Sequence, residues 1–240
     1  LTIVVILLIA TELGFRLGSW VARRREVTET QRSSVGFVTA GMLGLLAFLL
    51  GIALSLGQGR FEVSRAAVQA EANAIGTAWL RAGLFADAAG ERLQRDIAAY
   101  AGMRVEAIET AQSAADAERW AAETSAQQGR IWAQATGIVH QRADAISGAL
   151  VGALNDMFDR ASDQRRAFSS RMPLHIARLL LWSFVVTVAA VGYHFAMTGN
   201  RQFALSTILL IMWATALILI VDINRPMQGG VRVDAEPLRW

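Results

Sequence analysis

Long apolar runs alternate with one long polar stretch along this chain of 240 residues. The run 203–221 contains no charged residue, and a helix of that length spans about 28 Å, close to the hydrocarbon thickness of a bilayer. The pattern predicts an all-α, polytopic membrane protein with four transmembrane helices. The predicted spans are 1–21, 35–57, 174–197 and 203–221.

The stretch between the second and third spans has a different composition. It contains no apolar run of spanning length, and it is rich in the helix-forming residues Ala, Glu, Gln and Arg. We therefore expect a helical extramembrane domain inserted between two pairs of spans. The predicted organisation is 1–57 for transmembrane helices 1 and 2, 58–173 for the helical domain, 174–221 for transmembrane helices 3 and 4, and 222–240 for a C-terminal tail.

Within this domain the first helix, about 61–85, is expected to continue directly out of the second span. Breaks are expected near 86–90 and 113–116, followed by one long helix or a helix pair that reaches residue 171. The spans 174–197 and 203–221 are separated by five residues, so they should form an antiparallel hairpin.

An apolar stripe runs along the last part of the domain. Its members recur at helical steps: Ile131, Ile138, Ile146, Leu150, Leu154 and Phe158. A hairpin within the domain or a neighbouring subunit could cover this stripe. We expect that the stripe has no mate within one chain, so that copies assemble into a homo-oligomer.

The second predicted span is dense in small residues at steps of three and four: Gly44, Ala47, Gly51 and Ser55. Such a ribbon lets another helix approach closely. The rotated face carries Leu45, Phe48 and Ile52. If this helix lines a pore, these three side chains are candidates for a hydrophobic constriction. Helix packing explains the same pattern, and the sequence alone favours packing.

Two charged residues, Glu12 and Arg16, interrupt the first predicted span. They are four residues apart and share one helical face, so they can form an ion pair. Ionisable residues within a span are functional candidates. Mutual neutralisation near the interface, with Arg16 reaching towards the headgroups, is the structural alternative, and the sequence favours it.

All 23 basic residues are Arg, because the chain has no Lys, and it has no Cys. Disulfides, thiolate sites and lysine chemistry are therefore excluded. Residues 58–173 hold 13 Arg against 14 acids, whereas the rest of the chain holds 10 Arg against 6 acids, close to the apolar runs. Arginine at that position meets lipid headgroups, so the expected partner is the lipid bilayer and not nucleic acid.

The distribution of Arg also bears on orientation. One side of four spans would carry Arg23, Arg24, Arg25, Arg32 and Arg201. The other side would carry Arg60, Arg65, Arg165, Arg166, Arg171, Arg225, Arg232 and Arg239. Eight against five favours a cytoplasmic helical domain in a multi-pass protein of the bacterial inner membrane, although the triplet 23–25 opposes this orientation.

The sequence lacks the patterns of enzymes. No glycine-rich nucleotide loop, zinc-protease helix or nucleophile elbow is present, and the three His have no metal-ligand spacing. We therefore expect no catalytic residue, no metal and no cofactor.

Two short motifs carry a resemblance. The run 70–76, AEANAIG, and the run 222–226, DINRP, which is followed by Gly230, Val231, Arg232, Val233 and Glu236-Pro237, are similar to those of a bacterial membrane family described as bestrophin-like. The layout of that family also matches: two spans, a helical insert, two spans and a short tail.

Through this family, the chain has a more distant resemblance to bestrophins. Bestrophins are pentameric anion channels with cytoplasmic helical domains and an apolar neck on the second span, and the resemblance implies this architecture. The neck would fall on Leu45, Phe48 and Ile52. The neck pattern of several aromatic residues and the acidic cluster of a calcium clasp are both missing, so calcium gating is not predicted.

The motif residues also have a direct physical interpretation. Glu71 and Asn73 lie just beyond the second span, where they could contact ions or form a polar latch between helices or subunits. Asp222 and Arg225 are three residues apart at a helix end and can pair there. The structural interpretation, a latch, is favoured for both pairs.

These observations lead to two hypotheses. The first is a homo-oligomeric, bestrophin-like ion channel that conducts inorganic ions, by resemblance anions through a pentamer, with its pore lined by the second span. The alternative is a non-conducting membrane scaffold or sensor subunit whose helical domain binds a partner protein.

Overall fold

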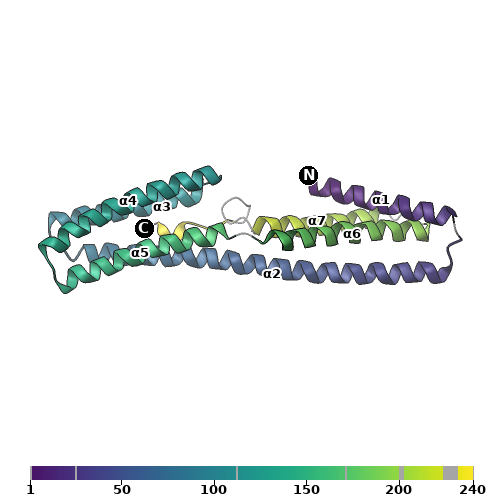
Figure 1. Cartoon of the computed structure of the whole chain (residues 1–240), viewed down its shortest axis with the longest axis horizontal. Helices are drawn as coiled ribbons and strands as arrows, with labels where there is room; N and C mark the ends of the chain where they lie inside the picture. The colour runs from purple at the N-terminus through teal and green to yellow at the C-terminus, as the bar shows by residue number, and fades with distance from the viewer. Residues whose placement is uncertain are drawn as a thin grey trace. The chain divides into compact units, whose positions relative to one another are not determined.

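A computed structural model describes residues 2–24, 26–111, 113–170, 172–199, 203–223 and 232–239. The described part of the chain is all-α, as predicted (Figure 1). Its helices are α1 (Thr2–Arg24), α2 (Glu29–Ala82), α3 (Ala88–Thr110), α4 (Ala114–Gln141), α5 (Ala145–Ser169), α6 (Leu174–Thr198) and α7 (Phe203–Ile223), with a short 3₁₀ helix, η1 (Glu236–Leu238).

The chain divides into two compact units. The first, which we call the apolar-helix unit, consists of Leu1–Gly57 and Met172–Val221. The second, the polar-helix unit, consists of Gln58–Arg171 and Asp222–Trp240. Helix α2 is continuous over 54 residues and contributes to both units, as the sequence predicted for the continuation of the second span.

In the apolar-helix unit, α1 and α6 pack side by side through glycines (Figure 1). A Cβ atom on Gly14 would lie 1.9 Å from the carbonyl oxygen of Ala189, and one on Gly192 would lie 2.2 Å from that of Thr11. Any side chain at these two positions would push the helices apart. The contact therefore depends on small residues, as in many helix pairs within membranes.

The core of the apolar-helix unit is built from four helices. It comprises Leu7, Ala10, Leu46, Leu50, Ala53, Leu180, Phe184, Val188, Ala214, Leu217 and Ile220. Phe184 and Trp213 meet edge to face, with ring centroids 5.7 Å apart, a favourable geometry for aromatic pairs. Helix α6 ends at Gly199, whose φ of 70° is the left-handed conformation that suits glycine at a helix C-terminus.

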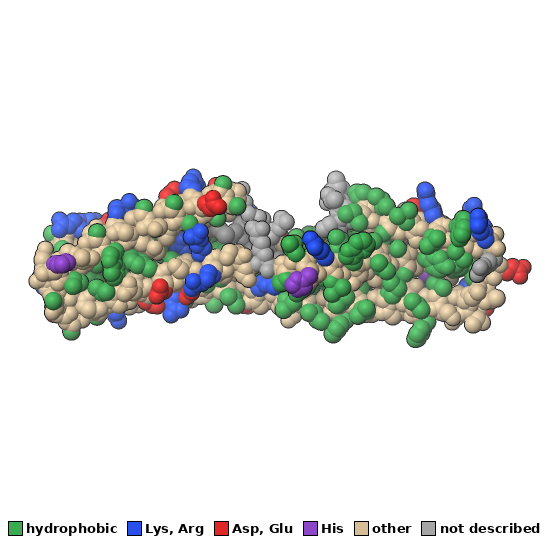
Figure 2. Space-filling model, viewed as in Figure 1, with side chains coloured by type: hydrophobic (Ala, Val, Ile, Leu, Met, Phe, Trp, Pro, Cys, Tyr) green, Lys and Arg blue, Asp and Glu red, His purple; other side chains and the backbone are tan. Residues whose placement is uncertain are grey.

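Hydrophobic side chains cover much of the visible surface of this unit (Figure 2). Within the described residues, three stretches are long and apolar enough to cross a membrane: Val4–Arg24, Glu29–Ala82 and Ala145–Thr198, the last of which contains α5 and α6. The apolar stretch Thr207–Ile223 of α7 is shorter. The predicted number of four spans therefore remains a prediction.

The helices of the polar-helix unit begin at side-chain caps. The Asp87 carboxylate accepts hydrogen bonds from the backbone N–H groups of Ala89 and Gly90 at the start of α3. Ser113 starts α4 and Asp144 starts α5, each in a reciprocal capping box with the residue three positions later. The predicted choice between one long helix and a helix pair after residue 113 is thus resolved as the pair α4 and α5.

The core of the polar-helix unit covers the apolar stripe. Ile131, Ile138, Leu150 and Leu154 are buried, and Phe158 packs against the same core, while Ile146 is exposed. Residues of α2 and α3 complete this core: Val68, Ala72, Ile75, Ala78, Leu93, Ile97 and Tyr100. The prediction that the stripe has no mate within one chain is wrong, because these helices supply it. The stripe is therefore no argument for an oligomer.

The end of the chain packs on the polar-helix unit. Val233, Ala235 and Leu238 are buried in its core, and η1 lies against α3. The Arg239 guanidinium forms an ion pair with Glu109 of α3. The described part of the C-terminal tail is thus a packed segment.

Candidate functional site

One face of α2 is exposed within the apolar-helix unit. Leu45, Phe48 and Ile52 are 59%, 66% and 44% exposed, although all three are large and apolar. Leu46, Leu50 and Ala53, on the opposite face, are buried in the core. The three predicted neck residues therefore share a face that the described part of a single chain leaves uncovered.

Small residues accompany these three side chains. A Cβ atom placed on Gly41, Gly44 or Gly51 would meet nothing within 4 Å. These glycines differ from Gly14 and Gly192, whose lack of a side chain is required by a packed neighbour. The exposed face of α2 thus has room for a close helix contact.

A second group of functional candidates lies at Glu71, which is fully buried in the polar-helix unit. Arg104 of α3 donates to both Glu71 carboxylate oxygens, from Nε to Oε1 at 2.6 Å and from Nη2 to Oε2 at 3.2 Å. Arg104 also donates from Nη2 to Gln164 Oε1 at 2.5 Å and from Nη1 to Thr124 Oγ1 at 3.3 Å. We call Glu71, Tyr100, Arg104, Thr124 and Gln164 the buried polar cluster; it joins α2, α3, α4 and α5.

The surroundings of Arg104 within the buried polar cluster keep its guanidinium charged. Burial alone lowers the pKa of Arg104, but the Glu71 carboxylate raises that pKa by more, so the guanidinium stays protonated. Burial also raises the pKa of Tyr100 well above its ordinary value of 10.0, and the Glu71 carboxylate raises it further. The Tyr100 hydroxyl accepts from Gln128 Nε2 at 3.3 Å and remains a neutral phenol.

One donor in the buried polar cluster has no acceptor. The Gln164 amide nitrogen is buried and has no hydrogen-bond partner among the residues that the structure describes. The Gln164 oxygen is used by Arg104, so the orientation of the amide is fixed by the guanidinium. The Glu71 and Arg104 side chains are thus engaged with one another and with Gln164, and the Gln164 nitrogen is the cluster atom left without a partner among the described residues.

Asn73 and Asp222, two further predicted polar residues, are not members of this cluster. Asn73 is exposed, and its side-chain oxygen accepts from Gln69 Nε2 at 3.1 Å on the same helix. Asp222 lies in the last turn of α7, whereas Arg225 lies outside the described residues. The predicted pairing of Asp222 with Arg225 stays a prediction.

The charged residues of the first predicted span do meet. Arg16 Nε donates to Glu12 Oε1 at 2.9 Å, as the four-residue spacing allows. The Arg16 side chain is 75% exposed. A functional role for this pair stays a prediction.

Arg104 and Gln164 were not among the predicted site residues. Both lie on the apolar face of their helices: Leu93, Ile97, Tyr100, Arg104 and Ala107 recur at steps of three and four, as do Leu150, Leu154, Met157, Ala161 and Gln164. A polar residue at a core position of such a pattern must find a buried partner. That position in the pattern is the signal that could have identified both residues.

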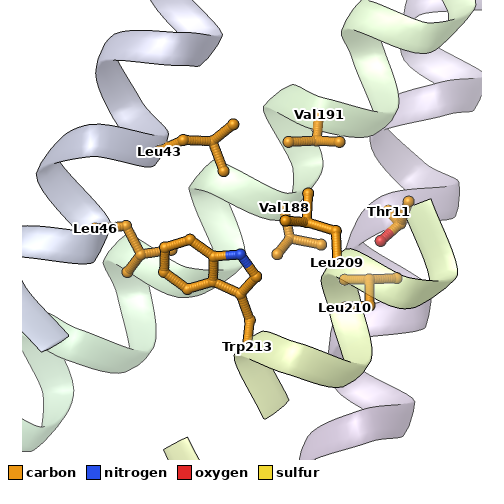
Figure 3. Close-up of a pocket in the computed structure, with 8 residues that line it drawn as sticks. All are labelled: Thr11, Leu43, Leu46, Val188, Val191, Leu209, Leu210 and Trp213. Carbon is orange, nitrogen blue, oxygen red and sulfur yellow. The ribbon is translucent and has the colours of Figure 1, made fainter. Parts of the chain in front are cut away.

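A small apolar pocket lies inside the apolar-helix unit (Figure 3). Its lining comes from α1, α2, α6 and α7: Thr11, Leu43, Leu46, Val188, Val191, Leu209, Leu210 and Trp213. None of these side chains carries a charge, and the Trp213 ring lies across the space. The lining of the pocket is therefore uncharged and mostly apolar.

Comparison with known proteins identifies the family. The bestrophin-like domain matches residues 5–238, nearly the whole chain. The chain belongs to the bestrophin-like family. This result confirms the resemblance seen in the short motifs around Glu71 and Asp222. No curated protein matches the bestrophin-like chain significantly.

Solved structures share the fold of this bestrophin-like chain. A crystal structure of a membrane protein is 13% identical, with a TM-score of 0.68 over 99% of this chain and 94% of that one. Two crystal structures of a bacterial bestrophin homologue from Klebsiella pneumoniae, each carrying a mutation, are 15% and 13% identical, with TM-scores of 0.64 and 0.66. They cover 99% of this chain, and 95% and 93% of their own. The bestrophin-like chain is a membrane protein with the fold of these structures.

Proposed function

We propose that the chain forms a homo-oligomeric ion channel whose pore is lined by α2. The observation that supports this proposal is the exposed face of α2 with Leu45, Phe48 and Ile52. Three large apolar side chains along one helix can form a hydrophobic constriction when copies of the helix surround an axis. Such a constriction gates ion flow by excluding water from the narrow part of the pore.

The small residues on this face favour a helix that packs against other helices around a pore over a helix that contacts only lipid. Hydrocarbon tails gain no advantage from Gly41, Gly44 and Gly51, whereas neighbouring helices can approach such positions closely. The oligomer is therefore proposed from the face of α2, in place of the apolar stripe of the polar-helix unit. A pentamer is what the resemblance to bestrophins implies.

Ion flux through reconstituted protein tests the proposal. Purified protein in liposomes should release a trapped salt faster than empty liposomes do. Phe48→Ala should raise the flux, because a shorter side chain widens the constriction. The matched control is Ile211→Ala, which removes an apolar side chain that is 61% exposed on α7 and should leave the flux unchanged. Flux equal to that of empty liposomes, under varied pH and voltage, would refute the channel.

A mass measurement separates the channel from the scaffold hypothesis. Native mass spectrometry of the detergent-solubilised protein should show a closed ring of several identical chains. A monomer or dimer, bound in fixed ratio to a different protein, would instead support the scaffold or sensor subunit.

A further inference from the structure

Two buried nitrogen atoms in the apolar-helix unit have no hydrogen-bond partner among the residues that the structure describes. They are Arg32 Nε on α2 and His194 Nδ1 on α6. The Nε atom of arginine always carries a proton and donates, and Nδ1 of histidine donates when it carries the ring proton. A buried donor without an acceptor costs free energy. A ligand with acceptor oxygens would remove that cost.

Gly36 brings the His194 ring onto the helix that carries Arg32. A Cβ atom on Gly36 would lie 3.1 Å from His194 Cε1 and 3.8 Å from each ring nitrogen, so the imidazole packs on the bare backbone of α2. Arg32 precedes Gly36 by four residues, about one helical turn, and lies on the same face of α2. The two donors therefore belong to one site, and both lie in the apolar-helix unit.

The surroundings of this site resemble the headgroup region of a bilayer. The site lies at the end of the apolar-helix unit where α1 ends, α2 begins and α6 ends (Figure 1). Arg23 and Arg24 belong to the last turn of α1, and the Arg24 guanidinium lies over the Trp20 ring, 4.2 Å from its centroid. Trp and Arg at the end of an apolar helix are typical of the membrane–water interface. A lipid headgroup is therefore the favoured source of the acceptor.

The neighbouring acids leave the charge of Arg32 available to a ligand. Arg32 Nη1 lies 3.8 Å from Glu29 Oε2, which is longer than a hydrogen bond, and the Glu29 side chain is 90% exposed. An exposed ion pair of this kind is weak. Glu26 is exposed as well. An anion that reaches Arg32 Nε would form a charge-assisted hydrogen bond that Glu29 does not supply.

We propose that Arg32 and His194 bind the phosphate group of an anionic lipid headgroup. The phosphate oxygens accept from Arg32 Nε and from the protonated His194 Nδ1, and the guanidinium balances the charge of the phosphate. Phe37 and Val38, next to Gly36, are 84% and 59% exposed and offer an apolar surface to the acyl chains. The site does not depend on ion conduction, so its failure would leave the proposed channel standing.

Lipid titrations test this site. The purified full chain in an uncharged detergent is titrated separately with phosphatidylglycerol, phosphatidylcholine and inorganic phosphate, and native mass spectrometry measures the bound fraction. Phosphatidylglycerol should bind about fivefold or more tightly than phosphatidylcholine, because the choline cation would meet arginine. Inorganic phosphate at the same concentration should not displace phosphatidylglycerol, since it has no acyl chains. Displacement on equal terms would overturn the lipid as the ligand.

Three variants change the site in different ways. Arg32→Gln removes the charge and should weaken the binding of phosphatidylglycerol about fivefold or more. His194→Phe keeps a ring but removes the donor, and it should weaken binding about threefold. Gly36→Ala should also weaken binding, because the added methyl group would crowd the imidazole and displace it.

Matched controls make the same chemical changes elsewhere. Gly102→Ala adds a methyl group to α3, where a Cβ atom would meet nothing within 4 Å, and Arg119→Gln removes a charge from an exposed side chain of α4. Both should bind phosphatidylglycerol as the wild type does. Helix content and melting temperature in the same detergent show whether each variant is folded. If folded Arg32→Gln and His194→Phe both bind as tightly as the wild type, the site is refuted.

Discussion

In the apolar-helix unit, α1 and α6 approach closely at glycines, which have no side chain. In the polar-helix unit, by contrast, four helices are linked by buried charged and polar side chains. Gly14 and Gly192 bring the backbones of α1 and α6 together. Glu71 and Arg104 join α2 to α3 within a core that is largely apolar. In lipid, apolar burial does not favour helix contacts, so close backbone packing replaces it. In water, apolar burial drives assembly and polar contacts add directional constraints.

One Glu–Arg pair from each unit, Glu71–Arg104 and Glu12–Arg16, makes this difference measurable. Arg104→Ala should lower the free energy of unfolding by about 3–5 kcal/mol, because it leaves the Glu71 carboxylate buried without its partner. Arg16→Ala removes the partner of Glu12 from an exposed pair and should cost at most about 1 kcal/mol. Denaturant titrations of both variants in detergent, followed by helix content, provide the comparison.

Replacing both members of the buried pair shows how much of the stability loss comes from an unpaired buried charge and how much from the lost side-chain volume. Glu71→Leu combined with Arg104→Met should be less destabilising than Arg104→Ala, because no unpaired charge remains. Equal losses for Arg104→Ala and Arg16→Ala would contradict the contrast drawn between the units.

The glycine contact of the apolar-helix unit predicts the next largest effect. Gly14→Ala should lower the free energy of unfolding by about 1–3 kcal/mol, since the added Cβ would overlap the Ala189 carbonyl oxygen and force α1 and α6 apart. Gly44→Ala introduces the same methyl group into open space in a single chain. It should leave the stability unchanged or raise it by up to about 1 kcal/mol, as expected for alanine in a helix.

Both glycine variants are measured by the same denaturant titration. A loss for Gly44→Ala as large as that for Gly14→Ala would show that the α2 face is already packed in the purified protein. A lower oligomer mass for Gly44→Ala would place that packing between copies.

The smallest predicted effect is a dependence on alkaline pH. The folded pKa of Tyr100 is raised above 10.0, so the folded protein holds this proton after the unfolded chain has released it. The contribution of Tyr100 to the free energy of unfolding is therefore fully present below pH 10. Above pH 10 it falls by about 1.4 kcal/mol per pH unit. Tyr100→Phe should flatten this slope. An identical slope in Tyr100→Phe would refute the assignment.

The sequence predicted the helices well because their signals are local. Ser113 and Asp116 mark the start of α4 as a capping box, and Pro173 precedes α6. The start of α5 was not located, because no Gly or Pro marks it. The capping pair of Asp144 and Ser147 is a weaker signal, which serine and aspartate also give on exposed helix surfaces.

The candidate site was predicted less completely, because its partners are far apart in the sequence. Glu71 drew attention through a family motif, but Arg104 lies 33 residues away and is one of 23 arginines. The mate of the apolar stripe was missed for a similar reason. Ile75 and Leu93 belong to helices whose own patterns are diluted by alanine, so the matching surface appears only when the helices pack.

The buried polar cluster has a consequence for how the helices align along their length. Sliding α5 by one turn, about 5.4 Å, would still set Leu, Ala and Met side chains against an apolar neighbour. The same slide would carry Gln164 away from the Arg104 guanidinium and leave both without their bond. The hydrogen bond of the planar Arg104 guanidinium to Gln164 therefore favours one axial register of α5 over the other registers that apolar packing alone would allow.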